Sequence, residues 1–153
     1  MNVDAQLIEH MMNPKNYGTL AGSNAEGIGK NPENGEKVAV YLRVATDKDG
    51  AYIEDIAFQA IGCTTTVVAG SMITQEAREL NLNGVRNLIE ATMKLLDRLP
   101  AEDAACSEMV ALALGAAIDT YEKRLEDPNF PVITYTVSNS CVPKEENLEK
   151  EEV

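Results

Sequence analysis

The sequence predicts an α+β protein in which a small antiparallel sheet of about three strands packs against several helices. Alternating apolar residues occupy residues 38–61 on both sides of a turn, and this is the pattern of a β-hairpin. Apolar residues then recur at helical spacing between residues 64 and 125. The chain has 153 residues, 44% of them hydrophobic, which is enough for one domain with its own core.

The hairpin is the clearest element of the pattern. Its first strand is expected over residues 38–45, where apolar residues take every second position. Asp47-Lys48-Asp49-Gly50 is typical of a hairpin turn, and the second strand is expected over residues 52–61. The alternation of the second strand changes phase beside Glu54 and Asp55, which predicts a β-bulge there.

The chain before the hairpin is predicted to contain a helix and then a long loop. Residues 3–12 place their apolar side chains on one helical face, and Asn13-Pro14 ends this helix. Residues 14–36 are rich in Gly, Asn and Pro and show no periodicity, so a loop is expected throughout this stretch.

Three helices are expected after the hairpin. The first starts near Thr64, and the second carries an apolar stripe that ends at Pro100. The longest is expected over residues 107–125, and Asp127-Pro128 closes it. Residues 132–137 are β-prone and precede a C-terminal stretch that is rich in glutamate.

The charge of the chain narrows the classes of function. The formal net charge is −12, and neither nucleic acid nor an anionic membrane attracts a polyanion, so neither is an expected partner. No apolar run approaches the ~20 residues of a membrane span, and the N-terminal residues do not resemble a secretion signal. Three cysteines without regular spacing do not suggest a disulfide framework. A reduced, cytoplasmic protein is therefore expected.

Cys63 and Cys106 are the best candidates for chemistry. Cys63 is expected at a strand-to-helix junction, and Cys106 just before or at the start of the longest helix. The free N–H groups at the start of a helix favour thiolate, which is the form that binds zinc or iron and attacks sulfur. The alternative is that both are small buried hydrophobic residues, because no Cys-x-x-Cys motif and no nearby His accompanies them.

The remaining reactive residues give weaker signals. Cys141 follows the β-prone segment and is either incidental or a ligand. His10, the single His, is expected to be a packed or surface residue. The sequence places no base beside either of the two candidate cysteines, and it has no Ser-His-Asp arrangement or Gly-rich phosphate loop, so the protein is not expected to be an enzyme.

Several short motifs follow one another in an order that matches a known family. Residues 9–18 carry a His-x-x-Asn-Pro-Lys-Asn-x-Gly pattern, residues 53–63 form a strand that ends in Gly-Cys, and Leu99-Pro100 precedes Cys106-Ser107. These motifs resemble the IscU/NifU family of iron–sulfur cluster scaffolds over roughly residues 3–125. On this basis residues 1–126 are expected to form the scaffold domain, and residues 127–153 a C-terminal extension with an acidic tail.

The resemblance implies a set of metal ligands that cluster at one exposed end of the fold. In the family, three cysteines, an Asp and a His hold a transient cluster or zinc. Cys63 and Cys106 match two of the cysteines, and Glu36 stands where the Asp would be. Asn34 replaces the first cysteine and Ala105 replaces the His, so two thiols and one carboxylate remain.

This reduced set leaves the coordination incomplete. A structural zinc takes four ligands, and a [2Fe–2S] cluster takes four terminal ones. Cys141 could fold back as a third thiolate, two chains could share one cluster as a homodimer, or an exogenous thiol or water could fill the gap.

The function implied by the resemblance is that of a scaffold or carrier for a transient iron–sulfur cluster. A cysteine desulfurase would deliver sulfur to a thiolate, and the cluster would pass to an acceptor protein. The alternatives are a degenerate paralogue that acts as an interaction or regulatory protein without metal, and a zinc-binding form. A charge reversal opposes docking of the family's dedicated chaperone, because Asp103 stands where the family has Lys.

Overall fold

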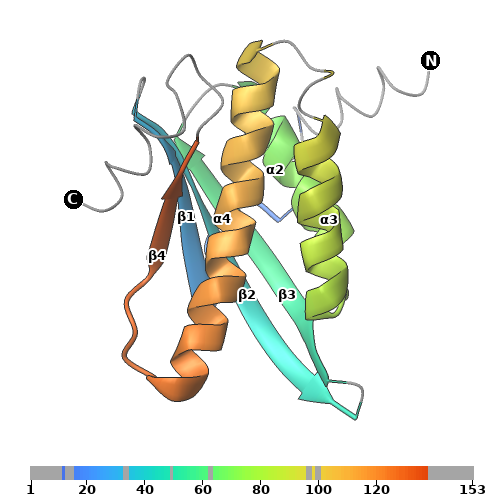
Figure 1. Ribbon diagram of the computed structural model, residues 1–153, viewed down its shortest axis with the longest axis vertical. Helices are drawn as coiled ribbons and strands as arrows, with labels where there is room; N and C mark the ends of the chain where they lie inside the picture. Colours follow the sequence, from blue (N-terminus) through green and yellow to red (C-terminus); the bar gives the residue numbers. More distant parts are fainter. Residues whose placement is uncertain are drawn as a thin grey trace.

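The computed structural model describes residues 12, 16–32, 35–48, 50–61, 64–95, 98 and 101–137. Over these residues a four-stranded sheet is covered on one face by three helices (Figure 1). The strands are β1 (Ala25–Asn31), β2 (Glu36–Asp47), β3 (Gly50–Ile61) and β4 (Ile133–Thr136), and the helices are α2 (Thr64–Ala77), α3 (Leu82–Leu95) and α4 (Ala101–Glu126). Apart from Met12, the helix expected over residues 3–12 lies outside the described residues.

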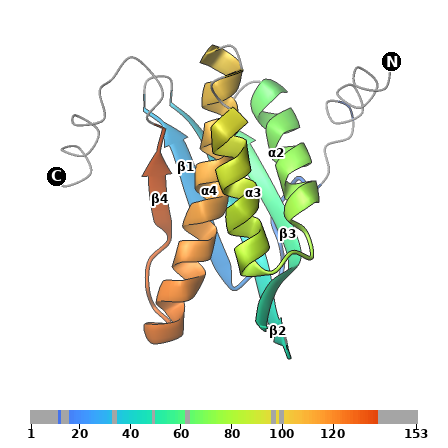
Figure 2. The ribbon, with the colours of Figure 1, turned by 45° about the vertical axis from the view of Figure 1, so that its right-hand side comes forward.

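The strands are ordered β3-β2-β1-β4. β1 and β3 each pair with β2 in antiparallel fashion, whereas β4 runs parallel to β1. The predicted α+β class is confirmed, but the expectation of a wholly antiparallel sheet of about three strands is wrong. α4 runs in the direction opposite to that of β1. The chain that leaves α4 therefore turns back along β1, and the fourth strand is parallel to β1 (Figure 2).

β1 corrects the prediction of a continuous loop over residues 14–36. Every second residue of β1 is buried, which is the pattern of a strand with one face on a core. Two of those buried positions are Gly27 and Gly29, where a sequence pattern would require large apolar side chains. The strand was therefore not recognisable from its composition.

The two glycines let α4 lie directly on the backbone of β1. A Cβ atom added at Gly27 would come within 2.1 Å of the Ala117 nitrogen, and one added at Gly29 within 2.2 Å of the Met109 carbonyl oxygen. Cβ atoms do not approach backbone atoms this closely, so only glycine fits at either position. The register between helix and strand is consequently fixed at two points.

The predicted bulge in the hairpin is confirmed. Arg43 pairs with Asp55 and Val44 pairs with Ile53, which leaves Glu54 as the extra residue of β3. Both strands run two residues further into the predicted turn than expected, so that Asp47 pairs with Gly50. The change of phase in the sequence therefore located the bulge correctly.

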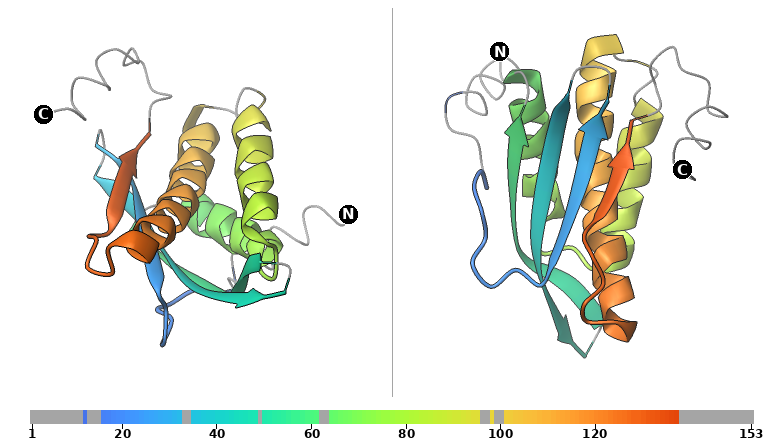
Figure 3. Two further views of the ribbon diagram at one scale, coloured as in Figure 1. Left: turned by 60° about the horizontal axis from the view of Figure 1, so that its bottom comes forward. Right: turned by 90° about the vertical axis from the view of Figure 1, so that its left-hand side faces the viewer.

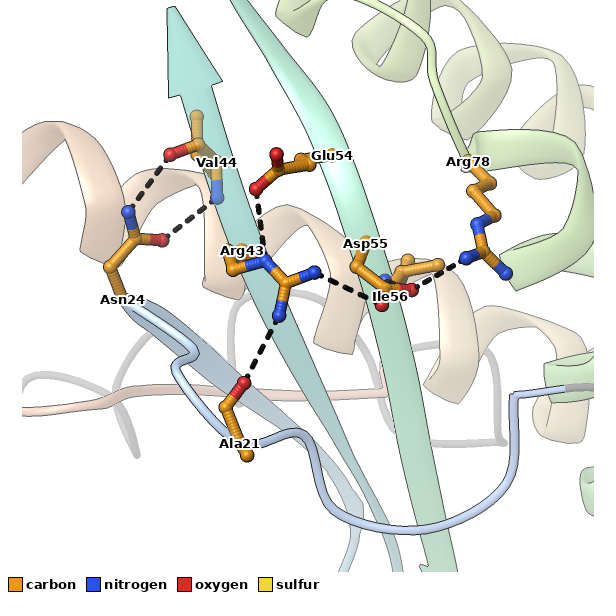
Figure 4. Close-up of polar contacts among 8 residues, drawn as sticks. All are labelled: Ala21, Asn24, Arg43, Val44, Glu54, Asp55, Ile56 and Arg78. Atoms are coloured by element: carbon orange, nitrogen blue, oxygen red, sulfur yellow. Dashed lines mark hydrogen bonds and ion pairs between the residues drawn. The ribbon is translucent and has the colours of Figure 1, made fainter.

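Arg43 joins three segments at this bulge (Figure 4). Its Nε donates to Glu54 Oε1 at 2.9 Å, its Nη2 meets Asp55 Oδ2 at 3.4 Å, and its Nη1 donates to the Ala21 carbonyl oxygen at 3.2 Å. Asp55 also forms an ion pair with Arg78, which lies just beyond α2. The distance from Asp55 Oδ1 to Arg78 Nη2 is 3.1 Å. Such half-exposed ion pairs are worth only about 0–1 kcal/mol each, so the network orients neighbouring segments rather than supplying much stability.

The described part of the opening motif attaches the chain to the free edge of β3. The Phe58 N–H donates to the Asn16 carbonyl oxygen at 2.9 Å, and the Gly18 N–H donates to the Phe58 carbonyl oxygen at 2.8 Å. The Asn16 side-chain amide donates to the Thr74 hydroxyl of α2 at 3.1 Å. Asn16 and Gly18 of the motif thus have a structural role.

Among the described residues, no helix covers the other face of the sheet (Figure 3). Within the described part of the chain, no helix has the length and apolar character needed to cross a membrane. The two-layer arrangement places the core between the sheet and the three helices, and its largest fully buried side chains include Phe58, Leu42 and Met109.

We expect Gly29→Ala to destabilise the protein by about 1–3 kcal/mol or more, because neither α4 nor β1 can yield without shifting backbone. Gly115→Ala is the matched control in α4, since its added Cβ would meet only Ile89 Cδ1, at 3.7 Å. That control should stabilise the helix by about 0.5–1 kcal/mol. Urea unfolding measures both, and equal stability of the two variants would contradict the proposed contact.

Candidate metal centre

The chain segments that carry the predicted ligands converge at one end of the sheet, which we call the site end (Figure 1). β1 ends and β2 begins there, with Asn31 paired to Glu36. β3 ends beside them, with Ile61 paired to Lys37, and the last residue of β4 pairs with Lys30. α2 and α4 both begin at the same end. The expectation that the candidate residues belong to one end is consistent with this convergence.

Two of the predicted site residues, Cys106 and Glu36, are among the described residues. Cys63, Cys141 and the replaced position Asn34 lie outside them, as does His10. The neighbours of Cys63 are nevertheless at the site end, because β3 ends two residues before it and α2 begins directly after it.

Glu36 lies on the helix-covered face of the sheet. Along β2 the buried residues begin at Val38 and recur at every second position, and Glu36 precedes Val38 by two residues. Its side chain is half-buried. Its partner Asn31 is also on this face, with 8% of its surface exposed. The carboxylate therefore belongs to the side of the sheet on which α4 packs.

Cys106 lies on the same side of the sheet and at the same end. α4 packs on β1 and runs in the opposite direction, since Ala117 lies over Gly27 and Met109 lies over Gly29. Cys106 is three residues before Met109, which places it further toward the end of β1. It is 6% exposed, and its sulfur is not in a disulfide. One thiol and one carboxylate thus share a corner of the fold.

The expected position of Cys106 in its helix is wrong. α4 begins at Ala101 rather than near Ser107, so Cys106 occupies the second turn. The helix already includes Glu102 and Asp103. The backbone N–H groups that are free at a helix start are therefore not next to Cys106, and the dipole argument for its thiolate loses its basis.

Three buried polar residues near the site end were missed by sequence reasoning. Asn31 is 8% exposed, Thr66 in the first turn of α2 is fully buried, and Glu108, two residues after Cys106, is 3% exposed. An acidic residue inside an otherwise apolar helical stretch was the available signal for Glu108. Asn31 gave none, because β1 was taken for a loop.

The described residues alone do not assemble a metal site. Among them, no group of three or more His, Cys, Asp or Glu side chains is arranged to hold a metal ion. Cys106 and Glu36 supply two donors of the kinds that zinc and iron accept. A metal ion held here by Cys106 or Glu36 would therefore need further donors from outside the described residues.

The uncovered face of the sheet carries a separate shallow hollow of about 380 Å³. It is lined by Tyr17, Glu26, Ile28, Lys37, Ala39, Tyr41, Gln59, Ala60 and Ile61. The Tyr41 hydroxyl donates to Gln59 Oε1 at 2.8 Å. The pKa of Tyr41 is raised above its ordinary value, mainly by burial and to a smaller extent by the nearby Glu26 carboxylate. A neutral tyrosine paired with an amide offers no thiolate or imidazole, so this hollow is not a second metal site.

Comparisons with known proteins agree with the motifs. The model of the NifU-like N terminal domain family matches residues 3–127. Iron-sulfur cluster assembly scaffold protein IscU 1 of Archaeoglobus fulgidus is 29% identical over 120 residues, which cover 78% of this chain and 76% of that protein. The scaffold protein IscU of Escherichia coli K12 is 25% identical over 130 residues, which cover 82% of this chain and 98% of that protein.

Comparison with solved structures shows that the fold is similar as well. The crystal structure of the N-terminal part of a NifU-like protein from Brucella abortus matches with a TM-score of 0.62 at 15% identity, covering 78% of this chain and 93% of that one. The resemblance inferred from the motifs is thereby confirmed. The family model matches most of the length of this chain, so the chain belongs to the NifU-like N-terminal domain family.

Proposed function

We propose that this protein is an iron–sulfur cluster assembly scaffold or carrier that holds its cargo through the thiolates of Cys63 and Cys106, with the Glu36 carboxylate as an oxygen ligand. The observation that carries the proposal is the convergence of Cys106, Glu36 and the β3–α2 junction at the site end. The relatives are named as iron-sulfur cluster assembly scaffold proteins, and these names support the same function.

The donors suit cargo that is received and released. Thiolates bind iron and also accept sulfur, whereas a carboxylate is a harder and more readily exchanged ligand. A cysteine desulfurase would supply sulfur as a persulfide on one of the thiolates, and an acceptor protein would take the finished cluster. The protein itself would turn over no substrate.

The departures from the family's ligand set bear on how firmly the cargo is held. Asn34 is an amide and Ala105 has no donor atom, so neither offers a good bond to iron or zinc. Cys141, a second chain or an exogenous thiol remain as sources of the missing ligand. The same departures support the alternative of a scaffold paralogue that keeps the fold but holds no metal, and a zinc-binding form uses the same donors.

We expect the full chain, reconstituted anaerobically with iron and sulfide, to develop the visible charge-transfer bands of iron bound to thiolate. Cys63→Ser and Cys106→Ser should each abolish these bands, because each removes a sulfur ligand. Ser107→Ala, next to Cys106, is the matched control and should keep them. Circular dichroism checks that each variant is folded. Colourless protein without bound metal in elemental analysis would instead favour the interaction protein.

We expect Glu36→Gln to weaken metal binding by at least about 10–100-fold, which is the usual effect of losing a group that merely supports a ligand. Glu26→Gln is the control, because it removes the same charge from the same sheet on the uncovered face. Competition of Zn²⁺ binding against a coloured chelator measures both affinities. Equal affinities would remove Glu36 from the ligand set.

Two further expectations belong to the same proposal. A cytoplasmic location fits an anionic chain with reduced thiols. A homodimer would bring Cys63 and Cys106 of two chains together, and a measurement of molecular mass with and without metal tests this arrangement.

A further inference from the structure

Two lysines lie side by side on the uncovered face of the sheet, at the site end. Lys30 of β1 pairs directly with Lys37 of β2, and both residues are exposed. Their side chains point away from the helices, because the neighbouring residues Gly29 and Val38 are buried on the helix-covered face. Like charges that are directly opposite on neighbouring strands repel, so this pair lowers the stability of the sheet.

The described part of the chain offers these two charges no compensating carboxylate. Neither lysine takes part in an ion pair or a side-chain hydrogen bond there. On the same face, Glu26 is about 13 Å from Lys30 along β1, which exceeds the Debye length of about 8 Å at physiological ionic strength. Asp55 is already paired with Arg43 and Arg78. The described residues therefore present a locally positive spot on a chain whose formal net charge is −12.

An apolar surface adjoins the lysine pair. On its other side Lys37 pairs with Ile61, which is 62% exposed. The next two residues along this face are Ile28 and Ala39, which pair with each other. Together with Lys37, Ile61 and Tyr17 they belong to the lining of the hollow of about 380 Å³. The positive spot thus borders a hollow that has exposed apolar side chains at its rim.

The size of this surface argues against a second copy of the chain as its occupant. Strands lie about 4.8 Å apart, and the residues of one face repeat about every 6.7 Å, so the stretch of the face from Lys37 to Tyr41 covers about 400 Å². A stable interface takes about 800 Å² from each partner. Two chains that each carry a formal net charge of −12 also repel one another. A short segment of a different protein fits this area better.

From this placement we infer that the surface around Lys30, Lys37 and Ile61 is a docking surface for a partner protein that presents a short acidic segment with one apolar side chain. The carboxylates of the segment pair with the two ammonium groups, and the apolar side chain enters the hollow beside Ile61. This contact relieves the repulsion between the lysines. The inference goes beyond the proposed function, since it requires no metal and applies equally to a paralogue without cargo.

An NMR titration of the ¹⁵N-labelled full chain with a defined probe tests the inference. The probe is a blocked peptide with one leucine between short runs of glutamate, and the control peptide carries lysine in place of glutamate. The glutamate peptide should shift the amide signals of Lys30, Lys37 and Ile61 until they saturate, and the lysine peptide should not. Absence of saturable binding, or shifts confined to the helices, would overturn the inference.

Charge reversal assigns the binding to the lysine pair. Lys30→Glu together with Lys37→Glu should weaken binding of the glutamate peptide by about 10-fold or more, because two attractions become repulsions. Lys94→Glu together with Lys123→Glu is the matched control, since it changes the net charge equally at exposed positions of α3 and α4. At physiological ionic strength this control should weaken binding by about twofold at most. Equal losses in the two double variants would show that only net charge matters and would contradict docking on the sheet.

A variant that changes no charge tests the apolar part of the surface. Ile61→Thr should weaken binding of the glutamate peptide by about threefold to fivefold, because it removes apolar area from the rim of the hollow. Leu125→Thr is the control, since Leu125 is similarly exposed, at 68%, but lies on α4. An unchanged affinity in Ile61→Thr would remove the hollow from the docking surface and overturn the inference as stated.

The remaining outcome concerns the acidic tail of the same chain. The glutamates that follow Lys144 are replaced together by glutamine, and the spectrum is recorded without peptide. Unchanged amide signals of Lys30, Lys37 and Ile61 support a separate partner. If these signals move, the tail itself occupies the surface, and the inference of a partner protein is overturned.

Discussion

The close contact between α4 and β1 is the constraint on which the rest of the structure depends. Gly27 and Gly29 bring the helix backbone onto the strand backbone, and no side chain can act as a spacer there. The two contacts fix how far α4 extends past the end of the sheet, and so they fix the height of Cys106 above Asn31 and Glu36. A wider spacing would let the helix slide, and the candidate thiol would lose its fixed relation to the strand ends.

The parts of the fold that sequence reasoning found are those in which side chains alone decide the structure. Alternating apolar residues revealed the hairpin, and a break in that alternation revealed the bulge at Glu54. β1 was missed because its buried positions are glycines, whose purpose is visible only when α4 is in place. β4 was recognised as β-prone, but its parallel partner could not be named while β1 itself was hidden.

Sequence motifs proposed the residue types of the candidate site, but they said little about its geometry. Cys63, Cys106 and Glu36 followed from motifs, and these mark chain positions rather than places in space. The start of α4 was expected near Ser107 but lies at Ala101, and this changed the surroundings of Cys106 from a helix end to a buried second turn. The buried polar residues Asn31 and Thr66 depend on long-range packing, which no local pattern reports.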